Sequence, residues 1–393
     1  MKTGRMSHPT DVMTRADPVA LTQQLVRTPS VNPVLEEGGD GEGAVAALAA
    51  EWLEGWGYQP AIVEVAPARY NVVARRGGGA GPSLLLNGHL DTVGVAGMAE
   101  PFSGDIREGR MYGRGSADMK SGVACALAAA AALADEEVPG ALIVALTADE
   151  EHASLGMAAL VEGGVSADAA VVCEPTSLAI MPAHKGFLWI DAGVEGRAAH
   201  GSRPEIGVDA IAHMGHLLVA FEEEAQRLAR ETDHPLLGPA SLHAGTIGGG
   251  SAPSVYPDRC DLVVERRTLP HETADSVMAE VERVLARARE RRPGLKGRAS
   301  AGLFRAATEV PGSSPLVTGL REACERSGVP GALKGMSAWV DACFLNERGT
   351  PAVCFGPGSI AQAHATVEWV SVAEIETCAR VLTDFARRFL RVG

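Results

Sequence analysis

Residues that could bind a metal ion follow the predicted buried strands of this 393-residue chain. His89 and Asp91 come directly after an apolar run at 83–87. Because they are two positions apart on an extended chain, their side chains project to the same side. Such a pair suits a metal-binding imidazole whose neighbouring carboxylate fixes its tautomer and raises its basicity. A structural histidine with satisfied hydrogen bonds fits the same pattern, so both interpretations stay open for the pair alone.

A glycine-rich segment, GRGSADMKSG at 113–122, precedes a predicted helix that is rich in small residues. A glycine-rich turn at the start of a helix can cradle a phosphate group. This segment lacks the spacing of a Walker motif, and the negative charge of Asp118 opposes anion binding. We therefore expect a tight loop that places the Asp118 carboxylate at the edge of the sheet, with a phosphate cradle as the alternative.

Acidic residues end the next two predicted strands. Glu150 and Glu151 follow the apolar run 142–147, and Glu174 follows the run 169–173. Adjacent acids at the end of a buried strand are costly unless they meet cations, because like charges repel in a low-dielectric site. Neighbouring residues of an extended chain point in different directions, so Glu150 and Glu151 can hold separate roles. Each acid taken singly could also be a helix cap.

Together these residues form a candidate metal-binding constellation. A last polar cluster, GPGSIAQAH at 356–364, follows the predicted strand 352–355. Open α/β sheets place their active sites at the carboxyl ends of their strands. Two histidines and three carboxylates suit a pair of zinc-like ions, with one bridging carboxylate and a water between the ions. The five side chains expected on one side of one sheet are His89, Asp118, Glu151, Glu174 and His364.

The order of the predicted elements indicates an α/β fold with an inserted domain. Strands alternate with helices in the first half, which is typical of a mostly parallel sheet with helices on both faces. After residue 186 the order becomes strand, helix, strand, strand, helix, strand, the pattern of a small ferredoxin-like α+β domain. We expect a catalytic domain at 1–185 and 306–393, interrupted by a second domain at 186–305. Predicted helices span 18–27, 43–57, 122–133, 208–228, 273–291, 314–327 and 373–390, and predicted strands span 70–74, 83–87, 142–147, 169–173, 187–196, 241–245, 260–267, 297–304 and 352–355.

Composition favours a folded protein and excludes several classes. The chain is 46% hydrophobic and 21% charged, which gives enough apolar surface for packed cores. A net charge of −14 argues against nucleic acid or an anionic membrane as the main partner, because both require basic patches. No apolar run is long enough to cross a bilayer, and residues 1–17 lack the apolar core of a signal peptide. We expect a soluble, cytoplasmic protein without nucleic-acid or membrane partners.

Cysteine usage points to a reducing compartment and away from a sulfur-ligated metal. The seven cysteines are scattered along the chain, and no CxxC pair occurs. Neither a disulfide framework nor a cysteine-rich zinc site is indicated. We expect most of them to be reduced thiols in core positions.

The motifs resemble those of the M20 group of metallopeptidases and amidohydrolases. This group contains acetylornithine deacetylases, succinyl-diaminopimelate desuccinylases, aminoacylases and glutamate carboxypeptidases. The matching segments keep the order found in the group and cover nearly the whole chain. The segments at 147–151, 173–186 and 356–364 look closest to acetylornithine deacetylases. The six matches are GHLDTV (88–93), GRGSADMKSG (113–122), TADEE (147–151), CEPTSL (173–178), AHKG (183–186) and GPGSIAQAH (356–364).

The resemblance implies how the metal ligands divide. His89 and Glu174 would hold one ion, Glu151 and His364 would hold the other, and Asp118 would bridge the two. The resemblance implies two divalent ions, zinc in the first place, with cobalt or manganese as alternatives.

The resemblance also implies residues that act on the substrate. Asp91 would orient the first histidine, and Glu150 would be the general base. The inserted domain corresponds to a lid and dimerisation domain, from which His200 would reach the active site of the partner subunit in a homodimer. Arg267 is the candidate clamp for a substrate carboxylate, because a guanidinium suits bidentate pairing; a surface arginine on a strand is the alternative. Ser254 stands in a segment where the group often has Asn and is a second substrate-binding candidate.

The resulting prediction is a two-metal amidohydrolase that cleaves the amide of an N-acyl amino acid, with acetylornithine deacetylation as the leading activity. Glu174 supports this, because the deacetylase, desuccinylase and aminoacylase branches carry Glu there, whereas many peptidase branches carry Asp. Desuccinylase, aminoacylase, and dipeptidase or carboxypeptidase activities are the alternatives within the group. Two alternatives lie outside the group. One is a non-catalytic binding relative, which would be expected to lack a metal ligand or the base. The other is a dinucleotide-binding protein, which would need GxGxxG after its first strand.

Overall fold

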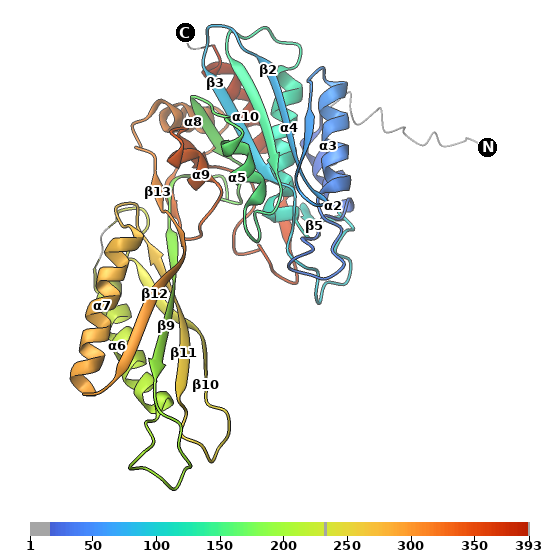
Figure 1. The fold of residues 1–393 in the computed structure, drawn as a ribbon. Coiled ribbons are helices and arrows are strands. Elements are labelled where there is room, and N and C mark those ends of the chain that lie inside the picture. Colours follow the sequence, from blue (N-terminus) through green and yellow to red (C-terminus); the bar gives the residue numbers. More distant parts are fainter. Residues whose placement is uncertain (1–15, 232–233, 392–393) are drawn as a thin grey trace. The chain divides into compact units, whose positions relative to one another are not determined.

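The computed structural model describes residues 16–231 and 234–391, and these form two compact units (Figure 1). Of the described residues, the first unit takes in 16–182, 310–334 and 340–391. The second unit consists of 183–309 and 335–339. The domain expected at 186–305 falls within this second unit, and its role as a lid and dimerisation domain stays a prediction.

A mixed sheet forms the centre of the first unit, with the strand order β1-β2-β6-β3-β7-β15-β8. The four central strands, from β6 to β15, pair in parallel. The outer strands β1, β2 and β8 pair antiparallel, so parallel pairing is confined to the middle of the sheet. The strands are β1 (Ala61–Ala66), β2 (Arg69–Gly77), β3 (Ser83–His89), β6 (Ala141–Thr147), β7 (Ala169–Val172), β8 (Ile180–His184) and β15 (Ala352–Cys354), and β13 (Thr308–Glu309) and β14 (Leu333–Met336) also pair with β8.

Helices cover both faces of this sheet, which confirms the predicted fold class. Leu84 and Leu86 of β3 lie in one core with α2, α3, α4, α8 and α10. Leu85 points to the opposite face, because successive strand residues alternate, and on that side α5 and α9 contact the strands. The helices are α2 (Pro18–Arg27), α3 (Gly43–Gly55), α4 (Ser121–Leu133), α5 (Leu155–Glu162), α8 (Pro315–Arg326), α9 (Ala342–Glu347) and α10 (Val372–Phe389).

Helix α4 approaches the end of strand β7 closely because it carries a glycine there. A Cβ atom on Gly122 would lie 1.9 Å from the carbonyl oxygen of Cys173. Eleven of the 13 residues of α4 are buried, which accounts for its small and apolar composition. The turn η1 (Ser116–Lys120) leads into this helix, and a small sheet of β16 (Trp369–Ser371), β5 (Arg110–Tyr112) and β4 (Ile106–Arg107) lies in the same unit.

The second unit is a four-stranded antiparallel sheet with two helices. Its element order is the predicted one, and its strand order is β10-β11-β9-β12. Alternate residues of β9 and β11, among them Ile190 and Val264, share a core with both helices. Asp209 and Thr273 cap the first turns of the two helices with their side chains. The elements are β9 (Gly186–Glu195), α6 (Ala210–Arg230), β10 (Ser241–Gly249), β11 (Arg259–Thr268), α7 (Ala274–Arg291) and β12 (Lys296–Arg305).

Two further sequence expectations concern burial and hydropathy. All seven cysteines are buried. Of the helices within 16–231 and 234–391, none combines the length with the apolar character that a membrane span requires.

Candidate metal centre

Three neighbouring parallel strands deliver four of the predicted site residues to one edge of the sheet. His89 is the last residue of β3. Glu150 and Glu151 follow β6, which ends at Thr147, and Glu174 follows β7. Because β6, β3 and β7 are adjacent and parallel, their carboxyl ends meet at the same edge. The short apolar runs in the sequence therefore predicted the placement of these side chains correctly.

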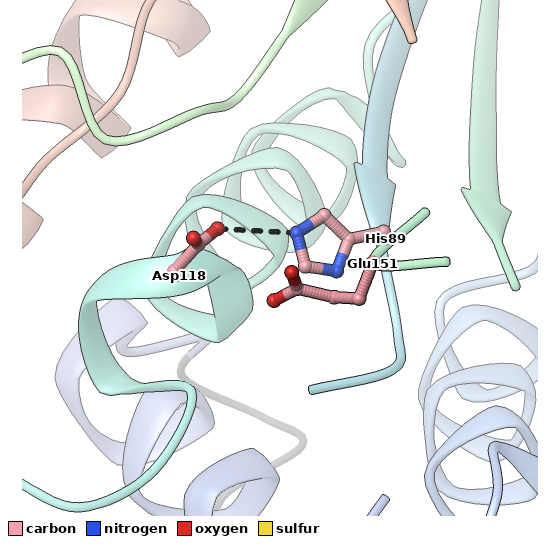
Figure 2. Close-up of side chains that lie close together, drawn as sticks. All are labelled: His89, Asp118 and Glu151. Carbon is pink, nitrogen blue, oxygen red and sulfur yellow. Dashed lines mark hydrogen bonds and ion pairs between the residues drawn. The ribbon is translucent and has the colours of Figure 1, made fainter. Parts of the chain in front are cut away.

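Asp118 lies between the two histidines. Its Oδ1 is 3.1 Å from His89 Nε2, and its Oδ2 is 3.5 Å from His364 Nε2. His364 Nε2 is also 2.9 Å from Glu151 Oε2. Figure 2 shows the side chains of His89, Asp118 and Glu151 converging, and the candidate ligand atoms of these three all lie within 4.8 Å of one another. One carboxylate with a histidine beside each oxygen is the arrangement that a bridging ligand needs.

The contact between His89 and Asp91 differs in detail from the expected one. Nδ1 of His89 donates to the backbone carbonyl of Asp91 at 2.9 Å, whereas the nearest carboxylate oxygen is 3.6 Å away. Because a carbonyl oxygen can only accept, Nδ1 carries a proton and Nε2 is the nitrogen that can face a metal. The Asp91 carboxylate instead accepts the backbone N–H groups of Glu150, at 3.1 Å, and Glu151, at 3.3 Å.

The carboxylates of this cluster carry more negative charge than the surrounding protein neutralises. Burial, with the charges of Asp118, Asp341 and Glu151, raises the pKa of Glu174 to about 8. Burial and the charge of Glu174 likewise raise the pKa of Glu150 well above its usual value. Among the residues that the structure describes, Glu151 Oε1 and Glu174 Oε1 are buried without a hydrogen-bond partner. Buried carboxylate oxygens are costly in this state, so the donor set of imidazoles and carboxylates fits divalent cations.

The histidine of β3 responds to the same negative charge. Burial lowers the pKa of His89, but the hydrogen bond to Asp118 and the charges of Glu150, Asp118 and Asp91 outweigh burial and raise that pKa well above its usual value. A cation is therefore favoured at this position, whether it is a proton or a metal ion.

Three predicted residues lie in the second unit. His200 and Ser254 belong to adjoining loops, since His200 forms a bridge with Val255 and the Gly201 N–H donates to the Ser254 carbonyl at 2.7 Å. Arg267 is near the end of β11, where its Nε donates to Glu265 Oε1 at 2.8 Å.

The second-unit sheet separates these candidates. Arg267 pairs with Phe187 at the start of β9, whereas the loop that carries His200 follows the end of that strand at Glu195. Eight residues of strand between the two positions correspond to roughly 26 Å at about 3.3 Å per residue. The structure therefore brings His200 and Ser254 together and leaves Arg267 at the other end of the same sheet.

Several buried polar residues next to the cluster were not predicted. Glu368 accepts the N–H groups of Ala117, at 2.9 Å, and Asp118, at 3.2 Å, and it also pairs with Arg114. It thereby fixes the turn that presents the Asp118 carboxylate. A second set is Asn32, Glu42 and Arg69, which contact Asp91 or the turn before Glu150. No motif or spacing in the sequence singles these residues out, because their partners lie far away along the chain.

The chain matches the family model described as Peptidase family M20/M25/M40 over residues 85–388. It belongs to the M20 peptidase family. It is 34% identical to an acetylornithine deacetylase of Myxococcus xanthus over 82% of this chain and 84% of the relative. It is 30% identical to an acetylornithine deacetylase of Vibrio cholerae over 93% of this chain and 96% of the relative. These matches confirm the family resemblance and identify the chain as a hydrolase that acts on amide bonds.

Solved structures share the fold at low sequence identity. A tripeptidase from Staphylococcus aureus matches with a TM-score of 0.78 and 19% identity, covering 97% of this chain and 99% of the other. A dinuclear metal-binding peptidase of the M20 family from Bacillus subtilis matches with a TM-score of 0.73 and 17% identity, covering 98% of this chain and 100% of the other. At these identities the likeness supports the fold.

Proposed function

We propose that this M20 enzyme is a two-metal amidohydrolase that removes the acyl group from an N-acyl amino acid, with acetylornithine as the leading substrate. The observation that carries the proposal is the position of Asp118, whose two carboxylate oxygens face His89 and His364. The relatives named acetylornithine deacetylase, at 30% and 34% identity, support the choice of substrate.

The ligand assignment follows the contacts of the cluster. His89 and Glu174 would hold one ion, His364 and Glu151 the other, and Asp118 both. We propose zinc, with cobalt or manganese as alternatives, because imidazole and carboxylate donors suit all three metals. When bound, the ions would polarise the amide carbonyl and lower the pKa of a bound water.

Glu150 is proposed as the general base. It adjoins a metal ligand without being needed as one, and burial and the neighbouring Glu174 raise its pKa well above its usual value, which makes the carboxylate a stronger base. Glu150 takes a proton from the attacking water. The oxygen of that water bonds to the acyl carbon. Glu150 then delivers the proton to the amide nitrogen as the bond between that nitrogen and the acyl carbon breaks. The products are the free carboxylic acid and the free amine.

His200 is proposed to donate a hydrogen bond to the oxygen that becomes negatively charged during attack. The Ser202 N–H donates to His200 Nδ1 at 3.2 Å, so Nε2 is the nitrogen that carries the proton. Such a donor stabilises the tetrahedral intermediate.

We further propose a homodimer formed through the second unit, in which His200 and Ser254 serve the partner's site. His200 and Arg267 lie at opposite ends of one sheet, so a single copy cannot present both to one small substrate. A site that uses both residues must draw on two copies of the chain, and two-fold dimers are the commonest oligomers. A cytoplasmic location and the lack of nucleic-acid or membrane partners stay predictions of the sequence.

The test combines metal analysis with a substrate screen. The purified chain is loaded with Zn²⁺, Co²⁺ or Mn²⁺ and assayed against N-acetylornithine, other N-acetyl, N-succinyl and N-formyl amino acids, and dipeptides. We expect about two metal ions per chain, a lower melting temperature after chelation, and fastest turnover of N-acetylornithine. Hydrolysis that survives complete chelation would overturn the two-metal proposal, and faster turnover of N-succinyl substrates or dipeptides would overturn the choice of substrate.

A further inference from the structure

The turn that carries Glu150 and Glu151 is held in an unusual backbone conformation. Asp149 has a φ of +67°, in the left-handed region that residues with a side chain seldom adopt. Its carbonyl accepts the N–H groups of Ala153 and Ser154, which closes the turn. A conformation of this kind persists only where surrounding contacts hold it.

Strand β2 supplies two of those contacts. Asn71 accepts the N–H of Ala148 at 3.0 Å and donates to the carbonyl of Gly156 at 2.8 Å, so it ties both ends of the turn. Arg69, two residues earlier and on the same face of the strand, donates from Nη1 to Asp149 Oδ1 at 2.8 Å.

Asn32 connects this support to Asp91. Its amide nitrogen donates to Asp149 Oδ1 at 3.0 Å and to Asp91 Oδ2 at 2.8 Å, and its oxygen is 3.3 Å from Arg69 Nη1. The Asp91 carboxylate in turn accepts the backbone N–H groups of Glu150 and Glu151. A continuous path of hydrogen bonds therefore runs from the arginine to the backbone of both acidic residues.

The charges of this network do not balance within it. The Arg69 side chain is 5% exposed and faces the carboxylates of Glu42, Asp149 and, at 3.9 Å, Asp91. Its Nε donates to Glu42 Oε2 at 2.8 Å, and Glu42 also accepts the Asp149 N–H at 3.2 Å. A buried ion cluster of this kind is a poor source of stability compared with apolar packing. Stability alone therefore gives little reason for such a cluster.

We propose that Arg69, acting through Asn32 and Asp149, is a positioning residue that fixes the turn bearing Glu150 and Glu151. The role in catalysis rests on the proposed function, since it places the base and one metal ligand relative to each other. The planar guanidinium reaches Glu42 and Asp149 with different nitrogens at once. The single ammonium of a lysine cannot reproduce this fork.

The test measures zinc affinity and kinetics for Arg69→Lys and Asn32→Ala, with Arg387→Met as the control. Arg387 pairs with Glu136 in the same unit and makes no contact with the turn. Zinc affinity is measured by competition with a chromophoric chelator, which needs no substrate. Residues that hydrogen-bond to metal ligands typically contribute about 10–100-fold to metal affinity or to activity. We expect losses of this size in zinc affinity or kcat for both variants, with KM within about twofold of the parent, and no such losses for Arg387→Met.

The outcomes separate the two proposals. Variants that are folded by circular dichroism and keep the parental zinc affinity and kcat would overturn the positioning role. An Arg387→Met variant that loses as much zinc affinity would also overturn it, because the effect would then be general. If the parent binds zinc but hydrolyses no N-acyl amino acid, the proposed function fails while zinc affinity still decides the role of Arg69. A parent chain that binds no zinc would overturn both.

Discussion

At the residue scale, six acids around the candidate site differ in what lies beside their charge. Glu42, Asp91 and Asp149 gather around the guanidinium of Arg69 and the amide of Asn32. The second group is Glu150, Glu151 and Glu174, whose pKa values are all raised by burial and by neighbouring carboxylates. The acids of the first group thus share one cation of the protein's own, the Arg69 guanidinium. In the proposed function, the second group binds metal ions or exchanges protons.

Glu150→Ala separates the base from the ligands. We expect this variant to keep its metal content, because Glu150 is not among the proposed ligands, while kcat falls by about 10²–10⁴-fold. Metal analysis and kcat of the same preparation provide the check. Glu162→Ala, at an exposed position on α5 in the same unit, should keep the parental kcat. A Glu150→Ala variant that turns over normally, or that loses its metal, contradicts the assignment.

We expect His184 to make the second unit sensitive to acid. Burial lowers the pKa of His184 to about 4. Its Nδ1 donates to the Lys185 carbonyl at 3.1 Å, and its Nε2 accepts from the Thr308 hydroxyl at 2.8 Å, which is the pattern of a neutral ring. In the unfolded chain, the His184 ring binds a proton near pH 6.5, so the stability that its neutral form gives the folded protein is complete above that pH. It is lost as the pH falls towards 4, by roughly 3 kcal/mol in total.

The measurement is the free energy of unfolding in urea at pH 7.5 and pH 4.5. His184→Gln should be less stable than the parent at pH 7.5 and should lose less stability between the two pH values, because Gln does not titrate. His271→Gln removes an exposed histidine of the same unit and should leave the parental pH dependence intact. If the parent and His184→Gln lose the same free energy of unfolding between the two pH values, His184 is not the source of the acid sensitivity.

Sequence reasoning found the residues that stand at the ends of predicted strands and missed those that support them. His89, Glu151 and Glu174 were found because each follows a run of apolar residues at a sheet edge. Arg69 and Glu368 were missed because their partners lie up to 254 residues away, at positions that only the fold brings together. The backbone carbonyl of Asp91, rather than its carboxylate, holds His89, and a sequence pattern cannot distinguish the two.

At the scale of elements, the fully buried strands and the strands of the second unit were predicted well, whereas several short or irregular elements of the first unit were missed. Strands β6 and β7 are buried at every position, so their sequences are continuous apolar runs. Strand β1 is exposed over its first four residues and lacks a clean alternation. Strand β8 contains Pro182, which weakens any prediction of a strand, and α5 has only eight residues.

The close approach of α4 to β7 can be tested with one methyl group. Gly122→Ala would place a Cβ atom 1.9 Å from the Cys173 carbonyl oxygen, so we expect a loss of about 3 kcal/mol in the free energy of unfolding. Gly215→Ala is the matched control, because Gly215 lies within α6 and a Cβ there would have nothing within 4 Å. That variant should gain about 0.5–1 kcal/mol. Equal effects of the two substitutions, measured by urea unfolding, would contradict the packing argument.

At the scale of the whole molecule, the candidate site residues divide between the two units. The cluster around Asp118 comes from the first unit, whereas His200, Ser254 and Arg267 come from the second. The sheet of the second unit keeps His200 and Arg267 apart by the length of β9. In the proposed two-fold dimer, each active site would therefore take His200 from one copy and Arg267 from the other.

The proposed two-copy site makes a prediction about mixed dimers. His200→Ala and Glu150→Ala should each be nearly inactive, because one lacks the oxyanion donor and the other lacks the base. Deletion of a comparable donor costs roughly 2.7–4 kcal/mol of transition-state stabilisation. In a dimer that contains one copy of each variant, one site combines an intact Glu150 with an intact His200 from the partner. Mixing the two proteins under conditions that exchange subunits should therefore restore up to about one active site per mixed dimer. The kcat of the mixture is compared with that of each variant alone, and subunit exchange is followed separately by mass spectrometry of labelled chains. If exchange is complete and the mixture stays as inactive as its parents, His200 does not serve the site of a partner copy.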